Sequence, residues 1–301
     1  MLHKVEDIPD FRREFLLPHR LSQLGPGLCA ADVNGDGLDD VFAGNGRNGG
    51  GAKLWLQQPD GGFRAAGSNP WASIPADIMG CLFVDAENDG DPDLYVVPGG
   101  SEYGWPTDKY KHRFYINDGK GNFSEDAGRI PLCDASGSCV VAADYDLDGD
   151  QDLFVGGRMV PGMYPIADSR SYVLRNDGGK FADVTAQLFS GLQRPGMVCA
   201  AVWSDFNNDN YPDLILSGEW MPPVFLQNNA GRSFSDQTQA FGMHEQIGWF
   251  NSILPTDADN DGDMDYIIGN KGWNSQYRAT RTEPLGVYWS DFDNNGRIDL
   301  L

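Results

Sequence analysis

Short runs of apolar residues alternate with acidic, glycine-containing turns along the chain. One apolar run leads into each acidic turn, as at 81–84 or 138–143, and a second leaves it, as at 94–97 or 153–155. These runs are short, contain many β-branched and aromatic residues, and are bounded by Gly and Pro, which is typical of strands. We therefore expect an all-β protein in which each acidic turn connects two strands.

A hairpin signature follows the second strand of several repeats. Residues 113–123 and 172–181 place Asn-Asp-Gly between alternating apolar residues, and 53–63 and 224–234 carry weaker versions. Asn and Gly tolerate the positive φ that tight hairpin turns need. Each repeat therefore offers four strands, with the acidic turn between the first and the second.

The acidic turn occurs six times, with its first residue at Asp32, Asp85, Asp144, Asp205, Asp257 and Asp291. Successive first aspartates are 53, 59, 61, 52 and 34 residues apart. Four-stranded units at this period indicate the blades of a β-propeller. The last interval is too short for a full blade, so we expect about five blades plus a partial sixth, and a ring that is incomplete.

Carboxylates stand at alternate positions of each turn, where they can wrap one hard cation such as calcium. An EF-hand would need a Glu at position twelve and a following helix, but the turn at Asp144 has Val155 there and continues as a strand. Carboxylates this dense repel one another unless a cation lies among them. The alternative is that they are solvated acidic turns without a metal.

We predict that each turn binds calcium through the side chains at positions one, three, five and nine and the backbone carbonyl at position seven. The predicted ligands are therefore Asp32, Asn34, Asp36, Leu38, Asp40, Asp85, Glu87, Asp89, Asp91, Asp93, Asp144, Asp146, Asp148, Asp150, Asp152, Asp205, Asn207, Asp209, Tyr211, Asp213, Asp257, Asp259, Asp261, Asp263, Asp265, Asp291, Asp293, Asn295, Arg297 and Asp299.

The six turns are not expected to bind equally well. Those at Asp144 and Asp257 carry carboxylates at positions one, three, five and nine, so they should bind best. The turn at Asp205 has Asn210 in place of the glycine at position six, and the turn at Asp291 has an arginine at position seven. We therefore rank these two last.

The charge of the chain argues against two classes of partner. Its 301 residues carry a net charge of −22, whereas binding to nucleic acid or to an anionic membrane needs clustered Lys and Arg. We expect no membrane insertion either, since no apolar run approaches the length of a membrane span.

Acidic turns of this kind suit millimolar extracellular calcium better than cytosolic levels.

Cysteine usage does not decide the compartment. Cys29, Cys81, Cys139 and Cys199 each lie in the apolar run before an acidic turn, where we expect small buried core residues. A pairing of Cys133 with Cys139 stays open. The sequence has no paired CxxC pattern of a zinc site.

The acidic turns with the strand and glycines that follow, as in 152–157 and 213–218, resemble the FG-GAP/VCBS repeats of integrin-α-like β-propellers. The loops at 156–165, 218–222 and 269–275 resemble those of bacterial surface proteins related to cartilage acidic protein, in which such repeats are joined to an ASPIC/UnbV domain. The resemblance implies a calcium-binding propeller of the seven-bladed type, exported from the cell to an extracellular, cell-surface or periplasmic location.

We expect a single propeller domain over 1–301 and interpret the chain as a fragment of a longer protein, the remainder of which would be a partner. The absence of a signal peptide then follows from the missing part. The expected repeats are 1–26 (the outer part of a preceding blade), 27–77, 78–137, 138–196, 197–248, 249–285 and a partial one at 286–301.

Strand direction places the long, irregular loops on the face opposite the acidic turns. Aromatic and polar side chains on such loops suit a glycan or a protein ligand. The residues expected there are Arg47, Tyr103, Trp105, Arg158, Tyr164, Glu219, Trp220, Trp273 and Asn274. The alternative for each aromatic residue is that it packs its loop against the next blade.

The favoured function is therefore a calcium-binding extracellular propeller that acts as a binding or adhesion module. Two alternatives remain: a purely structural module of a larger surface protein, and a calcium-dependent polysaccharide lyase with His112 or Tyr110 as base. The lyase hypothesis has only fold analogy behind it, because the sequence contains no known catalytic motif. We therefore do not expect an enzyme.

Overall fold

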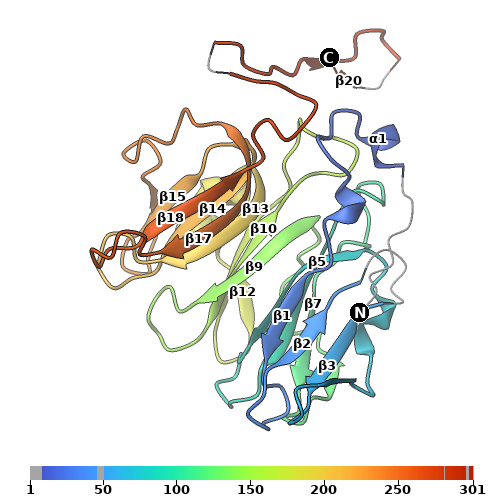
Figure 1. The fold of residues 1–301 in the computed structure, drawn as a ribbon, viewed down its shortest axis with the longest axis vertical. Coiled ribbons are helices and arrows are strands. Elements are labelled where there is room, and N and C mark those ends of the chain that lie inside the picture. The colour runs from blue at the N-terminus through green and yellow to red at the C-terminus, as the bar shows by residue number, and fades with distance from the viewer. Residues whose placement is uncertain (1–8, 46–50, 281, 296–297, 301) are drawn as a thin grey trace.

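The computed structural model describes residues 9–45, 51–280, 282–295 and 298–300. The protein is nearly all-β and forms a propeller of four-stranded antiparallel sheets, as the sequence predicts. Figure 1 shows these sheets following one another in chain order. Their first strands, β1, β5, β9, β13 and β17, adjoin in that order and line the axis.

Four sheets have the complete set of strands, each in chain order from the axis outwards, and we call them blades 1 to 4. Blade 1 consists of β1 (Leu28–Ala31), β2 (Asp40–Ala43), β3 (Lys53–Gln57) and β4 (Phe63–Ala65). Blade 2 consists of β5 (Asp77–Val84), β6 (Asp93–Gly99), β7 (Arg113–Asn117) and β8 (Phe123–Glu125). Blade 3 consists of β9 (Gly137–Ala143), β10 (Asp152–Gly157), β11 (Tyr172–Asn176) and β12 (Phe181–Asp183). Blade 4 consists of β13 (Met197–Ser204), β14 (Asp213–Met221), β15 (Val224–Asn228) and β16 (Phe234–Asp236).

The next repeat is smaller than a blade. It contributes β17 (Gly248–Thr256) and β18 (Asp265–Asn270), and β17 also pairs with the end of β14. The last acidic turn connects β19 (Trp289–Ser290) to β20 (Asp299–Leu300), which pair only with each other. In Figure 1 the end of the chain with β20 lies apart from the blades. The repeat expected at 249–285 thus has two strands in the described chain.

Residues 9–26 do not form the outer part of a blade, contrary to the expectation for 1–26. They contain helix α1 (Asp10–Arg13) and the 3₁₀ turn η1 (Leu21–Gln23) and no strand. Leu17 and Leu21 pack against Met159, Tyr164 and Met197, which lie in or next to the loops of blades 3 and 4. The amino-terminal segment therefore crosses the end of the propeller opposite the acidic turns, which we call the mouth, instead of extending a sheet.

The cores lie between neighbouring blades. One cluster joins blades 1 and 2, and the next two join blades 2 and 3 and blades 3 and 4. Trp71 shows how they are filled: it lies in the short turn η2 (Pro70–Ser73), contacts Phe42 and Tyr115 edge-on, and donates from Nε1 to the carbonyl of Ala52. Two further short helices, α2 (Thr185–Leu188) and η3 (Ser190–Gln193), cap the core of blades 3 and 4.

The five cysteines are free thiols, so Cys133 and Cys139 are not paired. Cys81 and Cys133 are buried, and Cys29, Cys139 and Cys199 are partly buried in the first strands of their blades. Their place in the strands agrees with the core position expected from the sequence. Among the described helices, none combines the length and apolar character that crossing a membrane requires.

Candidate metal centres and ligand pocket

The first aspartate of each acidic turn organises the turn by accepting backbone hydrogen bonds. Asp144 accepts the N–H of Asp148 at 3.0 Å on Oδ1 and that of Gly149 at 2.9 Å on Oδ2. Gly149 has a φ of 101°, which only glycine adopts without strain. The turns at Asp32, Asp85 and Asp205 repeat both bonds. The alternating Asp-x-Asp pattern thus forms the turn by itself.

The ninth residue, Asp152, ties the turn to the rest of its blade. It is fully buried, and it accepts the N–H of Tyr145 at 3.2 Å and that of Asn176, at the end of β11, at 2.8 Å. Burial raises the pKa of Asp152 to about 7, against the effect of these two hydrogen bonds. The same two bonds are made by Asp40 and Asp213. The predicted ligand at position nine therefore also has a structural role.

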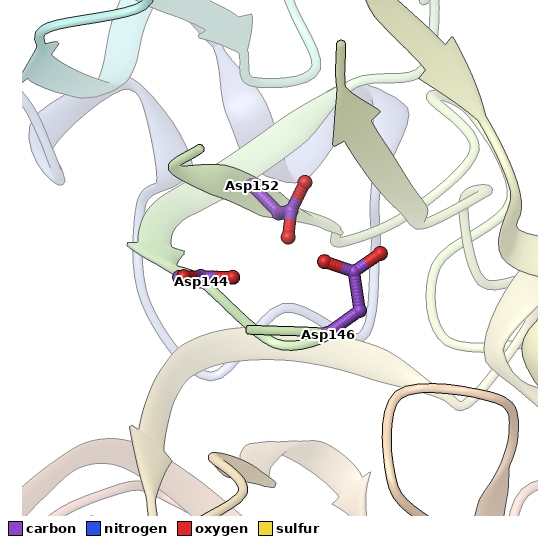
Figure 2. Close-up of side chains that lie close together, drawn as sticks. All are labelled: Asp144, Asp146 and Asp152. Carbon is purple, nitrogen blue, oxygen red and sulfur yellow. The ribbon is translucent and has the colours of Figure 1, made fainter. Parts of the chain in front are cut away.

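Three carboxylates converge in the turn at Asp144 (Figure 2). Asp144, Asp146 and Asp152 each offer an oxygen atom, and these atoms lie within 4.8 Å of one another. Calcium–oxygen distances are about 2.3–2.6 Å, so oxygens around one ion lie at most about 5 Å apart. Oδ1 of Asp146 is buried and has no hydrogen-bond partner among the described residues. An all-oxygen set with one unpartnered buried carboxylate oxygen fits a hard divalent cation.

The electrostatics of this cluster point the same way. Burial, together with the charges of Asp148 and Asp144, raises the pKa of Asp146. The carboxylate of Asp150, at position seven, faces away from the cluster: it accepts from Asn88 of the neighbouring turn at 2.7 Å and from the N–H of Gly178 at 2.8 Å. That orientation agrees with a role for its backbone carbonyl, not its side chain, as a ligand.

Two other turns gather carboxylates in the same way. Asp257, Asp259 and Asp265 form one such group, and Asp291, Asp293 and Asp299 form the other. The turns at Asp32 and Asp205 have an Asn at position three and place fewer carboxylates together. Arg297, the predicted carbonyl ligand of the last turn, lies outside the described residues.

The turn at Asp85 differs because its third side chain is engaged elsewhere. Glu87 forms an ion pair with Arg129, which also pairs with Asp126 at 3.2 Å. Burial and a hydrogen bond with Glu87 raise the pKa of Asp93 to about 8. Glu87 is one carbon longer than Asp146, which occupies position three of the turn at Asp144, and its side chain pairs with Arg129. Calcium would have to compete with this pair.

Asparagines at the end of the third strand join each blade to the blade before it. The side-chain Nδ2 of Asn117 donates to the carbonyl of Val33 at 2.8 Å, that of Asn176 to Ala86 at 2.9 Å, and that of Asn228 to Tyr145 at 2.7 Å. Each acceptor is position two of the preceding acidic turn. We call these three residues the inter-blade asparagines.

The sequence analysis missed these residues because it assigned them only to the hairpin turn. The available signal was their recurrence: Asn stands at the end of the third strand in blades 2, 3 and 4, whereas the first blade has Gln57 there. The described chain places no blade before blade 1. The asparagine therefore occurs where an acceptor from a preceding turn exists.

On the opposite face, several predicted ligand residues come together. Arg158 and Glu219, both buried, form an ion pair at 2.5 Å. Trp220 follows at a register shift in the pairing of β14 with β17, with a φ of 58°. Such a bulge redirects a side chain, and the indole Nε1 of Trp220 donates to the hydroxyl of Tyr164 at 3.0 Å. Asn274 lines the same cavity as Arg158.

The amino-terminal segment completes this region, and sequence analysis did not identify its role. The carboxylate of Glu14 accepts the N–H groups of Gly162 and Tyr164. His19 Nδ1 lies 2.9 Å from Lys271 Nζ, and His19 Nε2 lies 3.9 Å from Oε1 of Glu219. No motif marks these residues, because they meet only through the fold of segments 252 positions apart.

Other predicted ligand residues do not join this group. Tyr103 donates its hydroxyl to the carbonyl of Pro75 at 3.0 Å and packs against Tyr110. Trp273 is exposed, next to Arg278, and Trp105 is exposed to a lesser degree. Arg47 lies outside the described residues.

The two residues considered as a lyase base are buried in the core between loops and strands. His112 is 2% exposed and lies within hydrogen-bond distance of the Tyr95 hydroxyl and the Ala135 carbonyl. Tyr110 is fully buried. Neither side chain is placed where a substrate could reach it, so this form of the lyase alternative is wrong.

Comparison with protein families finds a known repeat in two segments of the chain. The model of the FG-GAP-like repeat matches residues 32–96 and 205–268, and each match begins at the first aspartate of an acidic turn. No curated protein sequence matches the chain.

Two solved structures resemble the chain at low similarity. One is a chain of the cryo-EM structure of RAG in complex with one melted RSS and one unmelted RSS, with 13% identity, coverage of 92% of this chain and 81% of the other, and a TM-score of 0.44. The second is from the crystal structure of BBS1N in complex with ARL6DN, soaked with mercury, with 13% identity, coverage of 82% and 90%, and a TM-score of 0.28. The two FG-GAP-like repeats, together with the four-stranded sheets, are consistent with an FG-GAP β-propeller.

Proposed function

We propose that this protein is a calcium-binding β-propeller that acts as a binding or adhesion module outside the cell, without enzymatic activity. The observation that carries the proposal is the cluster of Asp144, Asp146 and Asp152 with its unpartnered buried oxygen. The two FG-GAP-like matches contain four of the six turns, those at Asp32, Asp85, Asp205 and Asp257, and support the binding-module class.

The residues that would hold calcium in this turn are Asp144, Asp146, Asp148 and Asp152 together with the carbonyl of Asp150. Calcium supplies positive charge that offsets the repulsion among these carboxylates. Since Asp152 is hydrogen-bonded to the end of β11, an ion bound here would fasten the turn between β9 and β10 to the third strand of its blade. Metal binding and the stability of the blade would then be linked.

The ligand face in this proposal is the mouth opposite the acidic turns. Arg158, Tyr164, Glu219 and Trp220 are in contact there through an ion pair and a hydrogen bond. Trp220 also contacts Trp249 edge-on and lines a second, apolar cavity of about 560 Å³. Aromatic faces beside fixed polar groups suit a glycan or a protein loop.

Calcium binding is tested by thermal unfolding with increasing calcium and with a chelator. If calcium binds the folded state, the midpoint rises with the logarithm of its concentration. Asp146→Asn should reduce the rise, because it removes one charged ligand from the cluster. Oδ1 of Asp146 accepts no hydrogen bond, so the substitution breaks none at that atom. Asp108→Asn, at an exposed carboxylate outside the turns, is the matched control. A midpoint that is the same in calcium and in chelator contradicts the proposal.

Ligand binding at the mouth is tested with a glycan array and the variants Trp220→Ala and Trp273→Ala. Trp220 lies among the gathered residues, whereas Trp273 is exposed and outside them. Binding lost on Trp220→Ala and kept on Trp273→Ala supports the mouth as the site. Binding unchanged in both variants would return the structural-module alternative to first place.

We further infer that the chain belongs to a larger exported surface protein of the class in which such repeats accompany an ASPIC/UnbV domain. The loops at 156–165, 218–222 and 269–275 support this class. Detection of the protein on intact cells by an impermeant label is the test. Recovery only from the cytosol would contradict it.

A further inference from the structure

A polar cavity of about 750 Å³ lies on the axis of the propeller, at the mouth opposite the acidic turns. The first strands of successive blades contribute Met79, Ser138, Cys199 and Ser252 to its wall. His19, from the amino-terminal segment, contributes from across the mouth. The volume is within the range of about 300–1,000 Å³ that is common for small-ligand sites. The cavity is therefore large enough for a monosaccharide or a disaccharide unit.

The charge of the lining is opposite to that of the protein. Among the described residues that line the cavity are Arg20, Arg158 and Lys271, and none is an Asp or a Glu, although the chain has 44 acidic residues. Glu219 pairs with Arg158 from behind the wall and is itself fully buried. Inside a chain of net charge −22, the cavity thus presents an excess of positive charge.

Among the described residues, no carboxylate forms an ion pair with Lys271, although the charge of Glu219 acts on it. Its ammonium donates to Nδ1 of His19 at 2.9 Å, which requires that this nitrogen carry no proton. Burial lowers the pKa of His19 to about 4, and the charges of Arg158 and Lys271 act in the same direction, against that of Glu219. His19 is therefore neutral at pH 7 and does not add a charge. An anion in the cavity would meet Lys271 directly.

The remaining lining is neutral and rich in hydrogen-bonding groups. Ser138 donates its hydroxyl hydrogen to the carbonyl of Val198 and keeps lone pairs. Asn251 donates from its amide nitrogen to the carbonyl of Trp249, which leaves its amide oxygen free to accept from a ligand. Asn270 accepts from the N–H of Gly272 and keeps its amide hydrogens. Asn274 also lines the wall. Such alternating donors and acceptors match vicinal hydroxyl groups.

We propose that the axial cavity binds a sugar acid, a polyhydroxylated ring with a single carboxylate, with the carboxylate at Lys271 and Arg158 and the hydroxyls at the asparagine amides. This assignment rests on the proposed function, since it names the ligand class for the mouth of the binding module. A single carboxylate matches the one lysine in the described lining, and the side chains of Leu24 and Met79 offer an apolar surface to the ring carbons.

The test is calorimetric titration of the full chain with D-glucuronate, D-glucose and acetate in saturating calcium. Glucuronate should bind at least tenfold more tightly than the other two, because only it carries both the carboxylate and the ring hydroxyls that the cavity would bind. Glucose bound as tightly as glucuronate would overturn the role of Lys271, and acetate bound as tightly would overturn the role of the asparagines. No heat from glucuronate at 10 mM, a concentration chosen to reveal weak binding, would overturn the site as a whole.

Two variants locate the binding within the cavity. Lys271→Gln should weaken glucuronate at least tenfold, and Asn274→Ala should weaken glucuronate while leaving acetate unchanged. Lys180→Gln, at an exposed lysine of the β11–β12 hairpin on the other face, is the matched control. Unchanged affinity in Lys271→Gln would overturn the assignment, and the partial exposure of Lys271 makes a folded variant the expected outcome.

The same samples separate this inference from the calcium proposal. Glucuronate chelates calcium weakly, so titrations into calcium buffer without protein are subtracted. A thermal midpoint that rises with calcium in a protein that ignores glucuronate would reject the sugar-acid site and leave the calcium proposal intact. Glucuronate binding in a protein whose thermal midpoint does not change with calcium would reject the calcium proposal and leave the sugar-acid site intact.

Discussion

The turns at Asp144 and Asp257 have almost the same sequence and the same local geometry. In both, the glycine at position six donates to the first aspartate, at 2.9 Å from Gly149 and at 3.2 Å from Gly262. Position seven donates to position five, at 3.0 Å and 2.9 Å. Both gather three carboxylates. The local sequence is therefore sufficient to build the turn in either place.

Their surroundings are different. Asp152 is fully buried and accepts hydrogen bonds from Tyr145 and from Asn176 of the third strand, whereas Asp265 is exposed and accepts from Ala258. The turn at Asp144 is also covered by Asn228 and the hairpin of the next blade. The described chain has no such hairpin after β18. The same motif thus carries different energetic weight, because the rest of the blade and the neighbouring blade decide its burial.

The largest expected difference between the two turns is in the aspartate at position nine. Asp152→Ala removes two acceptors from buried backbone N–H groups, so it should lower the free energy of unfolding by about 4 kcal/mol. Asp265→Ala, at an exposed position, should cost less than about 1 kcal/mol. Denaturant unfolding in the presence of a chelator measures both without a contribution from metal. Equal losses in the two variants would show that burial does not separate the turns.

The contact between blades should give a smaller effect. Asn228→Ala removes the hydrogen bonds of Nδ2 to the carbonyls of Tyr145 and Pro212, and it leaves the N–H of Gly231 without its acceptor. We expect a loss of about 3 kcal/mol in the free energy of unfolding. The change also uncovers the turn at Asp144, and so makes it more like the turn at Asp257.

Gln57→Ala is the matched control for Asn228→Ala. Gln57 occupies the same place at the end of the third strand of blade 1, but in the described structure its side chain makes no hydrogen bond. The substitution should cost less than about 0.5 kcal/mol. A loss in Gln57→Ala as large as that in Asn228→Ala would mean that the position matters within its own blade rather than between blades.

Much of this architecture could be predicted from the sequence, because it is encoded locally. The alternation of apolar strands and acidic turns gave the four-stranded unit, and Asn-Asp-Gly located the hairpins at Asn117 and Asn176. The same local signals place Asp144, Asp146 and Asp152 in one turn. In each case the partners lie within one repeat, so spacing alone indicates the contact.

Features that depend on distant segments could not be predicted. His19 meets Lys271 only because the amino-terminal segment crosses the mouth, and that segment was expected to be part of a blade. Glu87 was treated as a ligand like Asp146, but Arg129 of the hairpin region engages it. The repeat expected at 249–285 has two strands in the described chain, since turn motifs show that a repeat begins but not that its outer strands form.

Two histidines extend the comparison between packed and exposed regions, with the smallest expected effect. His112 lies between blades 2 and 3 beside Tyr95 and Tyr172, whereas His244 is exposed in the loop before β17. Burial lowers the pKa of His112 to about 4 from a usual value of 6.5, against the hydrogen bond to Ala135 and the charge of Asp134. The unfolded chain therefore binds more protons than the folded protein between these two values.

The stabilising contribution of neutral His112 is thus complete above pH 6.5 and is lost as the pH falls towards 4. The loss of this contribution should lower the free energy of unfolding at pH 5 by roughly 2 kcal/mol relative to pH 7.5. Denaturant unfolding of the wild type and of His112→Gln at both values measures it, since the difference between the two proteins cancels other titrating groups. The wild-type dependence on pH in His112→Gln would show that this histidine is not the group that titrates, and that packing between blades leaves its protonation unchanged.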